Sequence, residues 1–192
     1  AMTASPSAFG AQPAPPVFRA RHALLKRLAD VVCLPSSRVN AFERAMTADL
    51  LVDMLREAEP EERMKVARRL ANLTEIPASL VRLLLRDRVE IAEALLAHAQ
   101  ALSDSDLMDC VRTTGLEHRR LVALRRGVSE VVSEALVEFG ESAVISCLLQ
   151  NDLAKLSNAA LEVIVALTRD EAQLAPMLLR RPELRPAHAY VL

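Results

Sequence analysis

One stretch of the chain decides its fold: residues 102–130, LSDSDLMDCVRTTGLEHRRLVALRRGVSE. Ser103 is followed by Asp106 at the capping-box position and by an apolar helix face that begins at Leu107. A second short apolar face, marked by Leu121, comes before the pattern starts again. The stretch therefore predicts one helical hairpin, and a hairpin of that size cannot enclose a core by itself.

The same arrangement recurs along the chain. An apolar residue precedes a helix-starting Ser or Pro at Ile76-Pro77, Leu102-Ser103, Val128-Ser129 and Leu156-Ser157, and less regularly at Leu184-Arg185-Pro186. These positions are spaced by 26, 26, 28 and 28 residues. Near-constant spacing predicts an all-α fold in which hairpins stack as a solenoid and share one apolar layer. The alternative is an irregular helical bundle.

Glycine and proline mark the expected helix ends. We expect Gly115, Gly127 and Gly140 to follow the ends of helices, where a left-handed residue is common. Prolines at 60 and 77 suit the first turn of a helix, where the missing N–H is not needed. Pro176 predicts either that the last helix begins well after Asp170 or that it is kinked.

Several segments resemble those of a known family: VEIAEALL (89–96), ALSDSDL (101–107), EHRRLVALRR (117–126), residues 128–138 and LLRRPELRP (178–186). From about Asn40 to the last residue the chain resembles an uncharacterised bacterial family of short HEAT-like repeats, typical of alphaproteobacteria. The resemblance implies an α–α superhelix and no known reaction. Its members usually continue beyond the point that matches Leu192, so we expect this chain to be the N-terminal fragment of a longer protein. Val132 departs from the pattern, because an acid is expected at that capping-box position.

Composition limits the class of protein. Hydrophobic residues make up 52% of the 192 residues and aromatic residues only 3%, so the core must be aliphatic. A net charge of −1 gives no overall field toward nucleic acid or anionic lipid. No apolar run is long enough to span a membrane, and the start lacks a signal-peptide pattern. Three cysteines without CxxC spacing fit a reducing compartment, which predicts a cytoplasmic protein.

The chain divides into two parts. Residues 1–18 form a Pro/Ala-rich segment that we expect to be a disordered tail, and residues 19–192 form a single helical-repeat domain. The domain opens with a basic amphipathic helix that carries Leu24, Leu28, Val31 and Val32 on one face. A capping helix that seals the first repeat is the favoured interpretation, and a membrane-surface or partner-binding helix is the alternative.

The candidate catalytic and metal-ligating residues are each explained by a role in the fold. The chain has no phosphate-binding glycine loop, and its four histidines show no ligand spacing, so we expect no cofactor and no metal. Ser103, Ser129 and Ser157 are expected N-caps rather than nucleophiles. Cys110 and Cys147 are expected to pack as small hydrophobes, and Cys33 is the one candidate for a reactive thiol. The sequence therefore predicts a protein without enzymatic activity.

Arginine pairs give the one surface signal. We expect six arginines to form a ridge for a partner or an anion: Arg68, Arg69, Arg125, Arg126, Arg180 and Arg181, with Arg119-Arg120 as a further pair. The predicted function is a scaffold or adaptor that binds a peptide or helix of another protein, with possible contact to the missing C-terminal region of the same chain. The alternative is a nucleic-acid or phosphate-group binder that uses the same ridge, although so few aromatics argue against nucleic acid.

Overall fold

The computed structural model describes residues 15–184, in which eleven α-helices and one short 3-10 helix follow one another and no strand occurs. The helices are α1 (Pro16–Val32), α2 (Ala41–Arg56), α3 (Pro60–Leu70), α4 (Ala78–Leu85), α5 (Val89–Leu96), α6 (Asp104–Thr113), α7 (Leu116–Ala123), α8 (Glu130–Glu138), α9 (Ser142–Gln150), α10 (Asn158–Leu167) and α11 (Leu174–Leu179), with 3-10 helix η1 at Pro182–Leu184. The expectation of an all-α fold is confirmed for this part of the chain. The expectations that fall on residues 1–14 and 185–192 lie outside it.

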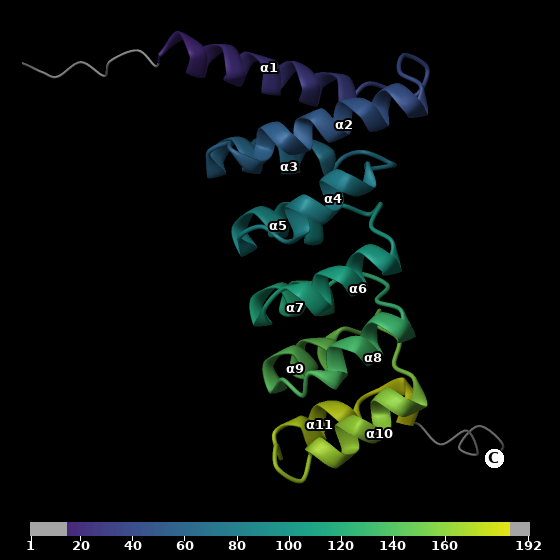
Figure 1. Cartoon of the computed structure of the whole chain (residues 1–192). Helices are drawn as coiled ribbons and strands as arrows, with labels where there is room; N and C mark the ends of the chain where they lie inside the picture. The colour runs from purple at the N-terminus through teal and green to yellow at the C-terminus, as the bar shows by residue number, and fades with distance from the viewer. Residues whose placement is uncertain (1–14, 185–192) are drawn as a thin grey trace, which may run out of the picture.

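The helices after α1 form two columns (Figure 1). In one column α2, α4, α6, α8 and α10 pack on one another in turn, and in the other α3, α5, α7, α9 and α11 do the same. Consecutive helices therefore pair across the two columns, and each pair lies on the pair before it (Figure 1). This packing fits a helical solenoid, as the repeated pattern predicts.

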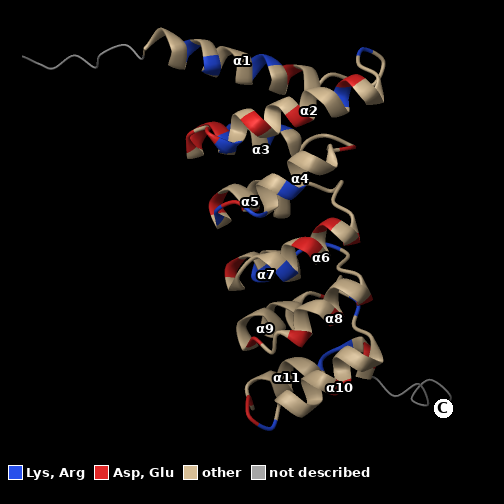
Figure 2. Ribbon diagram, viewed as in Figure 1, with Lys and Arg blue, Asp and Glu red and all other residues tan. Residues whose placement is uncertain are grey.

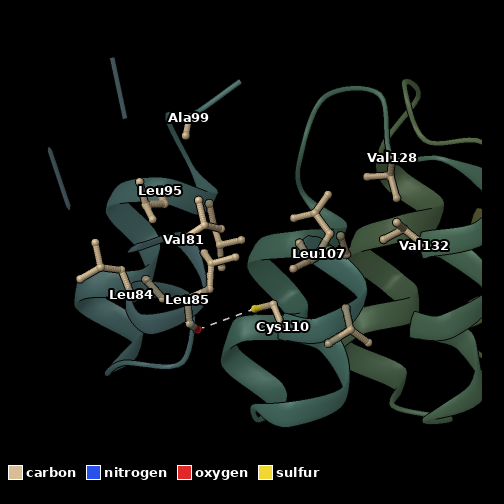
Figure 3. Close-up of a cluster of buried hydrophobic side chains, with 14 of the residues drawn as sticks. Val81, Leu84, Leu85, Leu95, Ala99, Leu107, Cys110, Val128 and Val132 are labelled. Atoms are coloured by element: carbon tan, nitrogen blue, oxygen red, sulfur yellow. Dashed lines mark hydrogen bonds between the residues drawn. The ribbon is translucent and has the colours of Figure 1, made fainter. Parts of the chain in front are cut away.

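The core is aliphatic and continuous from pair to pair. Leu80, Leu95, Val122, Leu136 and Ile164 are inaccessible to solvent and belong to one cluster of buried side chains. Figure 3 shows part of that cluster, where side chains of the α4–α5 pair approach those of α6 and the start of α8. Each buried Leu or Val contributes about 1.5–3 kcal/mol relative to exposure, so stacking supplies the stability that a single hairpin lacks.

Serine side chains start three of the helices, as the sequence predicts. The hydroxyl of Ser103 accepts a hydrogen bond from the N–H of Asp106 at 3.1 Å, and the Asp106 carboxylate accepts one from the N–H of Ser103 at 3.0 Å. Ser129 and Ser157 accept from the third residue beyond them at 3.3 and 3.1 Å. At Ser129 the return hydrogen bond is missing, because Val132 stands where the carboxylate of an acid would accept it from the N–H of Ser129.

Glycine and proline follow the expectations in part. Gly127 and Gly140 have φ of 70° and 62°, a left-handed conformation that favours glycine after a helix. Gly115 also follows the end of a helix, since Thr114 is the C-cap of α6, but its φ of −114° is extended and it serves at the same time as the N-cap of α7. Pro60 is the first residue of α3 and Pro77 is the N-cap of α4. Of the two alternatives for Pro176, the helix that begins well after Asp170 is the correct one. Helix α11 begins at Leu174, so this proline lies in its first turn.

Helix α1 lies across the first helices of the stack, where the sequence predicts a capping helix (Figure 1). It begins at Pro16 rather than near Arg19, so residues 16–18 belong to the helix. Its buried residues are Leu25, Ala29 and Val32. The predicted packing face is therefore shifted, because Leu24 is 49% exposed while Leu28 and Val31 are half-buried.

Candidate functional site

The predicted arginine ridge is divided between two environments. Arg68, Arg126 and Arg180 are exposed, and Arg69 is an exposed partner of Asp30 at 2.6 Å. Arg125 is half-buried and Arg181 is only 2% exposed. In Figure 2 basic and acidic segments are interspersed over both columns.

Arg125 holds two neighbouring helix pairs together. It follows α7, and its guanidinium donates to the carbonyl of Leu96 at 2.7 Å and to that of Ala99 at 2.9 Å, both at the carboxyl end of α5. The last carbonyls of a helix accept no hydrogen bond from within the helix, and they carry partial negative charge. Burial lowers the pKa of Arg125 below its usual value, and these carbonyls compensate the desolvated cation.

Arg181, which follows α11, makes the same kind of contact with the segment after α9. Its guanidinium donates to the carbonyls of Asn151 at 2.8 Å and Ala154 at 2.6 Å, which follow α9. It also forms an ion pair with Glu183 at 2.7 Å. Partial burial acts to raise the pKa of Glu183, but the hydrogen bond and charge of Arg181 together with hydrogen bonds from the backbone outweigh it, so the pKa lies below the usual value.

Asn151 completes the series between these two arginines. Its amide nitrogen donates to the carbonyls of Ala123 at 2.9 Å and Arg125 at 2.7 Å, at the carboxyl end of α7. Arg125, Asn151 and Arg181 thus connect α7 to α5, α9 to α7 and α11 to the segment after α9. We call these three residues the inter-unit donors. Sequence reasoning missed Asn151, although it also follows a short first helix of a unit.

Arg125 and Arg181 are therefore not free to form a ligand-binding ridge. A guanidinium that satisfies buried carbonyls cannot turn outward without leaving those acceptors unpaired. Arg119 is committed in the same way: it is buried, pairs with Glu141 at 2.6 Å, donates to the carbonyl of Thr114 at 2.8 Å and lies 4.1 Å from the centre of the Phe139 ring. Of the predicted residues, Arg68, Arg126 and Arg180 keep exposed side chains without an ion pair among residues 15–184.

Arg68 lies on the edge of a concave surface between α3 and α5. Three adjoining cavities of about 430, 610 and 420 Å³ share lining residues and form one channel along the two helices. We call it the α3–α5 trough; its lining includes Met64, Lys65, Arg68, Ala71, Glu90, Glu93, Ala94 and His98. The small side chains of Ala71 and Ala94 are buried and leave the space open, while longer side chains rise at its edges.

Both edges of the trough carry charges of both signs, since Glu61 lies on α3 and Arg88 is the N-cap of α5. Lys65 and Arg68 are exposed on α3, and Glu90 and Glu93 are exposed on α5. None of these four side chains forms an ion pair with another residue between 15 and 184. A ligand with both acidic and basic groups would therefore find partners on both edges.

The candidate nucleophiles and metal ligands have other roles. Burial raises the pKa of the Cys33 thiol, which opposes the reactivity that its position near a helix end suggested. Burial also raises the pKa of Cys110, whose thiol points to the carbonyl of Leu85 at 3.8 Å (Figure 3). His118 bonds through Nε2 to the carbonyl of Asp87 at 2.8 Å. Among residues 15–184, no three His, Cys, Asp or Glu side chains gather in a way that would hold a metal ion.

Within the same residues, no helix has both the length and the apolar character needed to cross a membrane.

Comparison with known proteins gives one match. The model of a bacterial family described as an uncharacterised conserved protein, DUF2336, matches residues 91–192. The match starts in α5, later than Asn40, where the resemblance in sequence was expected to start. It includes all three inter-unit donors. No curated protein and no solved structure matches the chain.

Proposed function

We propose that this chain, which belongs to the DUF2336 family of uncharacterised proteins conserved in bacteria, is a non-enzymatic scaffold or adaptor that binds a segment of another protein. Its helix pairs would continue as an α–α superhelix of HEAT-like repeats, and the bound segment would lie in the α3–α5 trough. The observation that carries the proposal is this trough, which combines an open concave surface with unpaired charges of both signs.

The dimensions of the trough suit a short peptide. It follows α3 from Pro60 to Ala71, and a helix rises 1.5 Å per residue, so its length is about 17 Å. An extended peptide advances about 3.3 Å per residue, so about five residues would fill it. Because successive side chains of an extended peptide point to opposite sides, acidic residues would face Lys65 and Arg68 while alternate basic residues face Glu90 and Glu93.

The state of the candidate nucleophiles supports a non-enzymatic role. Ser103, Ser129 and Ser157 accept hydrogen bonds from backbone N–H groups as N-caps. The pKa of both Cys33 and Cys110 is raised, which disfavours the thiolate. All three cysteines are free thiols, which supports a place in the cytoplasm.

The alternative, a phosphate or nucleic-acid site on an arginine ridge, has lost its main support. Arg125 and Arg181 donate to backbone carbonyls, so two of the six arginines are not available to an anion. This alternative becomes one outcome of the experiment that tests the scaffold function.

The test is affinity capture from a bacterial lysate, followed by cross-linking of the captured protein and mapping of the cross-links. The double variant Lys65→Glu with Arg68→Glu reverses two basic charges on the α3 edge of the trough, and Arg126→Glu reverses an exposed arginine outside it. We expect a protein partner that cross-links near α3 or α5, binds the Arg126→Glu variant normally and is lost from the double variant. Equal retention by all three chains, or retention of nucleic acid that elutes steeply with salt, would overturn the proposal.

A further inference from the structure

Helix α2 has an outward apolar row that nothing in residues 15–184 covers. Phe42, Met46 and Leu50 are 73%, 54% and 56% exposed and lie four residues apart, so they form one ridge along the helix. The opposite side of α2 is buried through Ala48, Leu51, Val52 and Leu55. The helix is therefore apolar on two sides, whereas packing within the stack uses only one.

Acidic side chains share the outward face of α2. Asp49 lies three residues after Met46 and Asp53 three residues after Leu50, so each carboxylate stands beside a residue of the apolar row. Both are exposed, and neither forms an ion pair within residues 15–184. Figure 2 shows acidic segments along α2.

The basic residues of α2 form no ion pair with Asp49 or Asp53. Arg44 is turned inward, where its guanidinium donates to the carbonyl of Leu34 at 2.7 Å. Arg56, three residues after Asp53, forms no ion pair in the described part of the chain. A surface that is apolar along one line and acidic beside it favours a partner that is apolar and basic in the same arrangement.

We propose that the outward face of α2 binds an amphipathic helix of a partner protein, with apolar residues against Phe42, Met46 and Leu50 and Lys or Arg side chains against Asp49 and Asp53. A row with four-residue spacing is the ridge that packs into the groove of another helix. A partner helix with apolar residues at i, i+4 and i+8 matches it.

A second copy of this chain fits the face less well. In a two-fold contact between two α2 helices, Asp49 and Asp53 of each copy would approach carboxylates of the other, and like charges oppose association. An anionic lipid surface is disfavoured for the same reason. The α2 face is also separate from the α3–α5 trough, so the two surfaces allow one chain to hold two partners at once.

The test uses two labelled peptides and the full chain. One peptide is an 18-residue helix with leucines on one face and lysines beside them, and the other has glutamate at every lysine position. Binding is followed by fluorescence anisotropy at low salt, and the oligomeric state of the chain is measured by light scattering. We expect the lysine peptide to bind at least tenfold more tightly than the glutamate peptide, and Met46→Ser to weaken it by at least fivefold.

Charge reversal makes the test decisive. Asp49→Lys combined with Asp53→Lys should invert the preference between the two peptides, because the apolar row is retained while the charge beside it changes sign. Glu162→Lys, an exposed acid on α10, is the matched control and should leave both affinities unchanged. Circular dichroism confirms that each variant is folded. The proposal is overturned by equal affinity for both peptides, by unchanged affinity in the reversed variant, or by a dimer that Met46→Ser dissociates.

Discussion

The two ends of the stack are held together by different chemistry. At the N-terminal end, α1 is joined to its neighbours by contacts between side chains: ion pairs of Arg21 with Glu57 and of Asp30 with Arg69, and a hydrogen bond between His22 and Glu62. From α5 onward, the inter-unit donors Arg125, Asn151 and Arg181 donate to backbone carbonyls of the preceding unit. The first kind of contact is largely exposed and the second is largely buried.

The difference predicts unequal contributions to stability. An exposed ion pair contributes about 0–1 kcal/mol and is weakened by salt. A hydrogen bond to a charged group contributes about 1.5–3 kcal/mol, and its loss leaves buried carbonyls without a partner. The α3–α5 trough lies at a junction where neither kind of donor bridges the carboxyl ends of the helices, because Ala97 and His98 follow α5 in place of an Arg or Asn. An open junction is thus found where an inter-unit donor is missing.

The largest effect is expected for Arg181→Ala. Arg181 is 2% exposed and donates to three carbonyls and to Glu183, so its removal should lower the free energy of unfolding by about 3 kcal/mol. Urea denaturation followed by circular dichroism measures it. Arg180→Ala is the control, since its side chain is exposed and its loss should cost less than about 0.5 kcal/mol. Equal costs at positions 180 and 181 would contradict the comparison.

A smaller loss, of about 1–3 kcal/mol, is expected for Arg125→Met, which keeps much of the side-chain volume but removes both hydrogen bonds to the end of α5. Arg126→Met, an exposed neighbour, provides the reference. Hydrogen exchange should also show faster exchange in α5 and α7 for the first variant than for the second. If both variants unfold at the same urea concentration, the hydrogen bonds of Arg125 do not contribute to the free energy of unfolding.

The C-terminal end should also respond to pH. Because the pKa of Glu183 is lower in the folded chain than its usual value, its ion pair stabilises the fold fully above that usual value and loses this contribution as pH falls through the folded pKa. The Tm values of the native chain and of Glu183→Gln should therefore differ at pH 7, and the difference should shrink as pH falls below the usual pKa of a glutamate. A difference in Tm that stays constant over this range would refute the linkage.

The smallest effect belongs to the N-terminal ion pairs. A double-mutant cycle of Asp30→Ala and Arg69→Ala should give a coupling energy of about 0.5 kcal/mol at low salt, which falls toward zero in 0.5 M NaCl. Urea unfolding of the four chains supplies the cycle. A coupling energy above about 2 kcal/mol would mean that this pair contributes as much to stability as the buried inter-unit donors do. The two ends of the stack would then not differ.

Sequence reasoning predicted the helices well because their signals are local. Ser103, Ser129 and Ser157 act on N–H groups only three residues away, so a short window of sequence contains both partners of each contact. The apolar faces of the paired helices repeat within a few residues for the same reason. Gly115 follows the C-cap of α6 as predicted, but its second role as the N-cap of α7 was not foreseen, because one glycine between two close helices can serve both.

The environments of the predicted site residues could not be foreseen, because they depend on long-range contacts. Arg125 and Arg126 are neighbours of the same type, yet one reaches carbonyls 26 and 29 residues earlier and the other stays exposed. No local pattern distinguishes them. The α3–α5 trough likewise needs Ala71 and Ala94 to face each other across two helices, and only the stacking brings them together.

The sequence by itself determined that this chain is a series of short helices whose apolar faces require stacking, since caps and periodicity act within one helical turn. The tertiary structure alone decided which arginines serve the backbone and which remain on the surface. A long guanidinium side chain takes its role from the acceptors that the neighbouring unit places within reach, and those acceptors have a position only after the units have packed.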